Sequence, residues 1–215
     1  SELDQRIEDR VMKDFADVAA GKERMPDIKD FGKAIALYKI AKDFDKRDAE
    51  KANPIQKDLQ KLLALSSFSD FEQKAADLFM GPYTLPFVFD VDADMKNTDV
   101  NVLHFGGPST FLPDTTTYKT ADAKKLLDIL QDQSINLLMM AGVGKSEART
   151  YVADALAFDQ KLAKIVKSTE EWSDYAAIYN PVNYAEFIAK FKSFKMADFM
   201  AAVLPVKPER IIVME

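Results

Sequence analysis

The chain has 215 residues, a formal charge of −6 at pH 7, one histidine and no cysteine. A composition of 47% hydrophobic and 30% charged residues is typical of a globular protein and argues against intrinsic disorder. The missing cysteines exclude disulfides and cysteine-based zinc sites and favour a reducing compartment. The negative charge argues against a nucleic-acid-binding role, and no apolar run reaches the roughly 20 residues that span a bilayer. Because the sequence starts at Ser1 without methionine, we expect a fragment of a longer protein.

Helical periodicity dominates the first 80 residues. Apolar side chains at helical spacing predict a helix over residues 3–19, a second over residues 27–52 and a third that begins near Pro54. Ser69 and Glu72 have the spacing of a capping box, which predicts a short helix from there to Met80.

The period then changes to that of strands. Two runs rich in β-branched and aromatic residues, 85–91 and 100–105, flank a turn-like stretch over residues 92–99. This pattern predicts a small β-hairpin, at about residues 85–105, with a longer loop between its strands. The stretch rich in proline and threonine that follows, as far as Thr120, is predicted to be loop.

Helices return in the second half of the chain. We predict helices over residues 123–141, 146–167, 183–191 and 197–204, with Ser146 as the N-cap of the second. The inward face of that second helix is predicted to carry Tyr151, Ala155, Phe158, Leu162 and Ile165. The final run, Ile211-Ile212-Val213, is predicted to be a truncated strand cut off from its partner. The fold class is therefore mainly α, and we expect residues 1–215 to form a single region of a longer protein.

His104 is the only histidine, which limits the chemistry available to the chain. Catalytic zinc sites use three protein ligands, mostly histidines, and one histidine without cysteine cannot supply them. A Ser-His-Asp triad would have to use a histidine in a regular strand. We therefore predict that His104 is a half-buried structural residue. No catalytic, cofactor-binding or metal-ligating residue is expected in residues 1–215.

Three further patterns have a functional and a structural interpretation. Asp90, Asp92 and Asp94 have the spacing of a calcium loop, but Met95 and Asn101 replace its glycine and glutamate, so we expect solvated carboxylates of the hairpin loop. The phosphate-loop-like residues 142–146 follow a helix, and Met139 stands where the first glycine belongs, so we interpret the glycines as a helix stop. Met139 and Met140 are expected in the core. The aromatic residues Trp172, Tyr175, Tyr179 and Tyr184 either pack a loop onto the helices or line a peptide groove.

The hairpin and the residues after it carry a family resemblance. The run 87–99 leads through Val102-Leu103-His104-Phe105 and Gly107-Pro108 to Leu112-Pro113-Asp114 and Tyr118. Later landmarks are Phe158-Asp159-Gln160-Lys161-Leu162-Ala163, Tyr179-Asn180-Pro181, Ala185-Glu186 and Ile211-Ile212-Val213. In this order, over nearly the whole chain, they resemble the N-terminal region of the neprilysin and endothelin-converting enzyme family, most of all its bacterial oligoendopeptidase O branch. Thr117 and Trp172 depart from residues common in the family.

The resemblance implies a function for the parent protein. In this family a C-terminal catalytic domain holds zinc in a His-Glu-x-x-His helix with a downstream Glu-x-x-x-Asp, and no such motif occurs in this sequence. The corresponding N-terminal segment is a helical lid over a cavity that admits only peptides. We therefore expect zinc in the parent enzyme, a partner in its own C-terminal catalytic domain, oligopeptide substrates and a bacterial cytoplasmic location, without nucleic-acid or membrane partners.

Two other interpretations stay open. The chain could be an independent helical module that binds peptides or a protein partner, which requires that the strand Ile211-Ile212-Val213 is already paired. It could also be a stand-alone hydrolase that uses the carboxylates of the loop 90–99.

Overall fold

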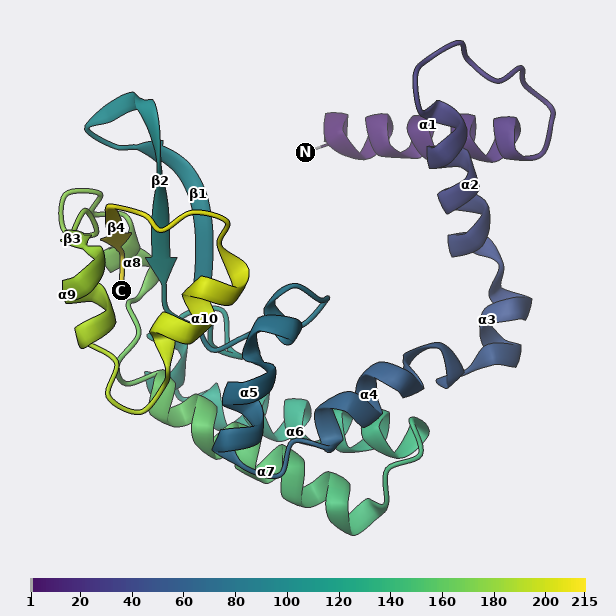
Figure 1. The fold of residues 1–215 in the computed structure, drawn as a ribbon. Helices are drawn as coiled ribbons and strands as arrows, with labels where there is room; N and C mark the ends of the chain where they lie inside the picture. Colours follow the sequence, from purple (N-terminus) through teal and green to yellow (C-terminus); the bar gives the residue numbers. More distant parts are fainter. Residues whose placement is uncertain (1) are drawn as a thin grey trace. The chain divides into compact units, whose positions relative to one another are not determined.

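The computed structural model describes residues 2–215. The chain divides into two compact units, Ser1–Gln56 and Lys57–Glu215. Both are largely helical, as the sequence predicts, and the only sheet among the described residues lies in the second unit (Figure 1). Among the described residues, none of the helices combines the length and the apolarity that crossing a lipid bilayer requires.

The first unit contains α1 (Glu2–Ala19), α2 (Phe31–Lys42), α3 (Phe44–Glu50) and η1 (Asn53–Ile55). Its small core contains the buried Ile35 and three half-buried aromatic residues. The ring of Phe15 lies 5.3 Å from that of Phe31 and 5.9 Å from that of Tyr38. The predicted single helix over residues 27–52 is wrong. The chain breaks at Asp43, whose side chain accepts a hydrogen bond from the backbone N–H of Lys46 and so caps a new helix.

The helices of the second unit follow the predicted order. They are α4 (Gln56–Leu63), α5 (Phe68–Phe79), η2 (Thr117–Lys119), α6 (Ala123–Met140), α7 (Lys145–Leu162), α8 (Thr169–Trp172), α9 (Tyr184–Ala189) and α10 (Met196–Val203). Two predicted N-caps are wrong. Ser67, not Ser69, caps α5 by accepting from the N–H of Asp70, and Gly144, not Ser146, precedes α7. Gly142 does end α6, with a φ of 92° that suits glycine.

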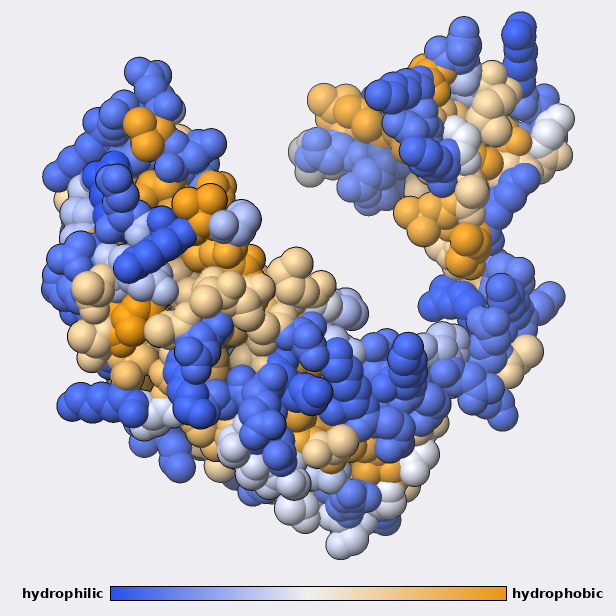
Figure 2. Space-filling model, in the orientation of Figure 1, coloured by the Kyte–Doolittle hydropathy of each residue, from blue (hydrophilic) through white to orange (hydrophobic). Residues whose placement is uncertain are grey.

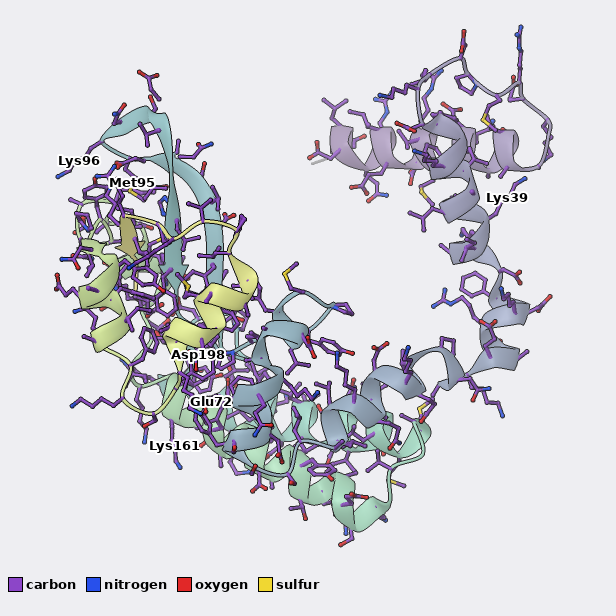
Figure 3. The ribbon with its side chains drawn as sticks, viewed as in Figure 1. Lys39, Glu72, Met95, Lys96, Lys161 and Asp198 are labelled. Atoms are coloured by element: carbon purple, nitrogen blue, oxygen red, sulfur yellow. The ribbon has the colours of Figure 1, made fainter. Side chains whose placement is uncertain are left out.

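Four strands form one sheet in the order β1-β2-β4-β3. β1 (Val88–Asp94) and β2 (Asn97–Gly106) form the predicted hairpin, but only Met95 and Lys96 separate them, so the expected longer loop is wrong (Figure 3). β4 (Arg210–Val213) pairs in parallel with β2 and antiparallel with β3 (Pro181–Asn183). The prediction that this strand lacks its partner is therefore wrong, because β4 lies inside the sheet.

The core of the second unit lies against one face of this sheet and is rich in phenylalanine. Phe187 is 1% exposed, and its ring lies 5.0 Å from those of Phe105 and Phe191. α5, α9 and α10 supply the residues that cover the sheet, among them Leu78, Met196, Phe199 and Met200. Side chains alternate along β1 and β2, so the residues between the core positions, including Asp90 and His104, belong to the opposite face.

Candidate functional site

α7 carries two apolar stripes, and only one of them is buried in this chain. The buried stripe consists of Ala148, Val152 and Leu156, and the buried acid Asp159 follows it on the same helix. Most of the stripe predicted to face inward does not do so. Phe158 is 55% exposed, Ile165 just after the helix is 77% exposed, and Tyr151 and Ala155 are also exposed, whereas Leu162 is half-buried. The spacing correctly identified an apolar helix face, but not the face that this unit buries.

α6 also carries an apolar stripe that is exposed. Leu126, Ile129, Leu137 and Met140 lie at helical spacing and are exposed, and Met140 reaches 78%. The expectation that Met139 and Met140 lie in the core is wrong, since both are exposed. Figure 2 shows hydrophobic residues at the surface over the two helices, among charged ones. We call Leu126, Ile129, Leu137 and Met140, together with Tyr151, Phe158 and Ile165, the uncovered stripes.

A buried carboxylate ties the loop before α6 to α7. Asp159 is 3% exposed and accepts hydrogen bonds from the backbone N–H of Phe111, at 2.8 Å, and from the Tyr118 hydroxyl, at 2.5 Å. Burial, followed by the bond to this carboxylate, raises the pKa of Tyr118 above its ordinary value. The network fixes the loop in place. The family landmark over residues 158–163 includes Asp159, but the residue pattern does not predict that this acid is buried while others on α7 are exposed.

A second buried carboxylate lies at the tip of the hairpin. Asp94 is 1% exposed, forms an ion pair with Arg210 and accepts a hydrogen bond of 3.0 Å from the hydroxyl of Tyr179. The expectation of a solvated loop carboxylate is therefore wrong for Asp94. A register shift between Ala93 and Asp94 separates this side chain from Asp90 and Asp92, which are exposed as expected but lie in β1 rather than in a loop.

His104 lies on β2 with 7% of its surface exposed, which makes it more buried than predicted. Its Nδ1 atom is 3.3 Å from the sulfur of Met214, and its Nε2 atom is buried without a hydrogen-bond partner. A cavity of about 390 Å³ adjoins it, lined also by Asp90, Asp92, Trp172 and Met214. Among residues 2–215, no three histidine or acidic side chains lie close enough together to hold a metal ion.

The four aromatic residues of the stretch 172–184 do not line a common groove. Trp172 adjoins the cavity at His104, with the Lys167 ammonium 6.0 Å from its ring. Tyr179 contacts Asp94, and the Lys207 ammonium lies 4.4 Å from the ring of Tyr184. Tyr175 is largely exposed. Each ring therefore belongs to a different local contact.

Comparisons with known proteins agree over the full length of the chain. Residues 1–215 match the N-terminal model of Peptidase family M13. The chain is 77% identical over 215 residues to a neutral endopeptidase of Lactobacillus helveticus, and 31% identical over 218 aligned residues to one of Lactococcus lactis subsp. cremoris. Each alignment covers 100% of this chain but only 33% and 34% of those relatives, so the chain spans about a third of their length.

Solved structures show the same fold. PepO from Lactobacillus rhamnosis superimposes with a TM-score of 0.81 at 23% identity, over 98% of this chain and 34% of that one. The Mycobacterium tuberculosis zinc metalloprotease Zmp1 gives a TM-score of 0.79 at 16% identity, over 99% and 33%. The resemblance inferred from the hairpin and the later landmarks is thereby confirmed, and the chain belongs to Peptidase family M13.

Proposed function

We propose that this chain is the N-terminal, mostly helical lid region of a neprilysin-like zinc metalloendopeptidase that hydrolyses oligopeptides. In this proposal it supplies cavity walls and substrate-size selection, and catalysis is performed by residues elsewhere in the polypeptide. The observation that carries the proposal is the uncovered stripes on α6 and α7, in a chain that spans about a third of its relatives. Exposed apolar side chains that gather along a helix face indicate a contact that another part of a protein covers.

The residues of this chain do not fit a catalytic zinc ion. Such a site needs three protein ligands and an open position for water. The single histidine has its Nδ1 atom against Met214, and no third ligand lies near it among the described residues. We therefore propose that zinc is bound in the parent enzyme by residues outside this chain. This agrees with the names of two of the proteins it resembles, a Streptococcus gordonii zinc metalloproteinase and Zmp1.

The partner that covers the stripes is, in this proposal, the C-terminal catalytic domain of the same polypeptide. Burial of apolar surface stabilises such a contact by about 25 cal/mol per Å². This favours a lid that packs closely against the catalytic domain over one joined to it only by the polypeptide chain. A wall of packed helices excludes folded proteins from a cavity and admits flexible peptides. The relatives named above are bacterial, and we propose the cytoplasm, whose reducing conditions suit a chain without cysteine.

The test is to divide the complete polypeptide after Glu215 and to assay hydrolysis of a quenched fluorescent oligopeptide. We expect neither part alone to hydrolyse it and the mixture to recover activity. Phe158→Asp with Ile165→Asp in this chain should abolish the recovery, because two charges would be buried in the contact. The matched control is Val206→Asp, at an exposed valine outside both stripes. Hydrolysis by this chain alone, or full recovery by the double variant, would refute the proposal.

The alternative is an independent helical module that binds peptides or a protein partner without enzymatic activity. One observation favours it: β4 is paired on both sides, which this alternative requires. The two functions differ in the behaviour of the isolated chain. An independent module is a stable monomer that binds no hydrophobic dye, whereas a lid without its partner binds dye along the uncovered stripes. A stand-alone hydrolase at residues 90–99 is disfavoured because Asp94 is held by Arg210 and Tyr179.

A further inference from the structure

The face of the sheet opposite the phenylalanine core carries an acidic cavity. Asp90 and Asp92 lie two residues apart on β1, and Asp90 is directly opposite His104 on β2. All three line the cavity of about 390 Å³, together with Trp172. The cavity thus combines two carboxylates, one imidazole and one indole.

The two carboxylates are not neutralised within the described part of the chain. Each uses one oxygen to accept the backbone N–H of the next residue, Val91 at 2.8 Å and Ala93 at 2.7 Å. Across residues 2–215 neither carboxylate forms an ion pair, and the second oxygen of each has no hydrogen-bond donor. Two such groups beside a concave surface attract a cation.

His104 provides a second and independent indication of a ligand. The Met214 sulfur can only accept a hydrogen bond, so in the neutral ring the proton belongs on Nδ1 and Nε2 carries the lone pair. Nε2 is buried without a donor among the described residues, and leaving a buried acceptor unpaired destabilises a protein. The ligand that satisfies this site must therefore donate hydrogen bonds as well as carry positive charge. It reaches Nε2 by moving Met95 or Met214, since both line the cavity and methionine changes rotamer readily.

We propose that this cavity binds a guanidinium group. A guanidinium presents several N–H donors in one plane, which matches the free oxygens of Asp90 and Asp92 and the lone pair of His104. It also stacks on aromatic rings, and Trp172 supplies one. A divalent cation fits less well, because the described residues contain no cluster of three ligands. The guanidinium comes either from an arginine of a bound peptide or from an arginine in the remainder of the polypeptide.

The composition of the chain makes the first experiment specific. Trp172 is its only tryptophan and His104 its only histidine, and both line the cavity. N-acetyl-arginine amide is titrated into the chain, and the tryptophan fluorescence and the imidazole ¹⁵N shifts are recorded. We expect both signals to saturate together. N-acetyl-citrulline amide, which has the same shape without charge, should bind about tenfold more weakly.

Variants then assign the binding to the cavity. Asp90→Asn and Asp92→Asn should each weaken binding about three- to fivefold, as loss of an exposed ion pair does. Asp99→Asn, an exposed acid on the same hairpin that does not line the cavity, should leave it unchanged. Equal binding of the citrulline compound, or equal weakening by Asp99→Asn, would overturn the proposal.

The complete polypeptide distinguishes the two sources. If a peptide supplies the guanidinium, the arginine compound binds there too, and the Asp90→Asn/Asp92→Asn variant loses binding at an unchanged melting temperature. If the remainder of the polypeptide supplies it, the compound does not bind and the same variant melts at a lower temperature. The proposal would be overturned if the complete polypeptide showed neither binding of the arginine compound nor a lower melting temperature in the variant. Binding to this chain alone does not require peptidase activity, so the result stands apart from the proposed function.

Discussion

The carboxylate of Asp94, at the end of β1, forms an ion pair with Arg210, the first residue of β4. It also accepts the backbone N–H of Lys96 at 2.8 Å and the hydroxyl of Tyr179. The interaction joins the tip of the hairpin to the strand that lies between β2 and β3. A group held by three donors in this way stabilises the fold only while it is ionised.

Asp94 should therefore make the free energy of unfolding depend on pH in the acid range. The bond from Lys96, followed by those from Tyr179 and Arg210, lowers its pKa below the ordinary value of 3.8, against the opposing effect of burial. The stabilisation is fully present above the unfolded pKa and is lost as pH falls through the lower folded pKa. We expect Asp94→Asn to lower the urea midpoint at pH 7 and the difference between the two midpoints to shrink as the pH falls below 3.8. A difference that does not shrink with falling pH, or one matched by Asp99→Asn, would contradict this.

The N-cap of α5 is Ser67, whereas the sequence pattern predicted Ser69, and this difference can be tested. The Ser67 hydroxyl accepts a hydrogen bond from the backbone N–H of Asp70, whereas the Ser69 hydroxyl accepts one from the side chain of Gln73. Ser67→Ala should cost about 1 kcal/mol of unfolding free energy. Ser69→Ala should change it by less than about 0.5 kcal/mol. Chemical denaturation of both variants measures the difference, and the reverse order would show that the helix starts where the capping-box pattern placed it.

These two serines illustrate what local patterns can and cannot specify. Helical spacing correctly gave the position and order of the main helices of the second unit, because an amphipathic stripe is a property of consecutive residues. Spacing does not specify which of several possible hydrogen-bond partners a backbone group takes. The N-cap at Ser67, the helix break at Asp43 and the pairing of β4 each depend on that choice. A stripe also does not reveal its partner: the apolar face of α7 was recognised, but the unit buries the neighbouring face instead.

The candidate site was less predictable than the fold for a related reason. Asp90, Asp92 and Asp94 look equivalent in sequence, yet the register shift at Ala93 sends only the last into a buried ion pair. The contact between His104 and Met214 joins residues that are 110 positions apart. Such relationships depend on sheet register, and spacing along the chain does not encode it.

Asp159 should be the acid on α7 whose removal costs most. Asp159→Ala leaves the backbone N–H of Phe111 and the Tyr118 hydroxyl without their shared acceptor, which should cost about 2–3 kcal/mol. Asp154→Ala removes an exposed acid from the same helix and should be nearly neutral. Thermal unfolding gives the ranking, and limited proteolysis should cut residues 108–120 faster in the Asp159 variant only. Equal cleavage of the two variants would show that the loop is held by other contacts.

Two phenylalanines distinguish the core of this chain from the surface proposed to be covered. Phe187→Ala opens a cavity among the rings of Phe89, Phe105 and Phe191 and should cost about 3–5 kcal/mol in this chain. Phe158→Ala truncates a ring that is 55% exposed and should cost less than about 0.5 kcal/mol here. In the complete polypeptide the proposed contact buries Phe158, so the same change should cost about 2 kcal/mol or more. Denaturant unfolding of both variants in both contexts measures these four values. A Phe158 effect that stays small in the complete polypeptide would mean that the remainder of the protein does not cover the stripe on α7. In that case the proposal that a catalytic domain packs on this face of the lid would be refuted.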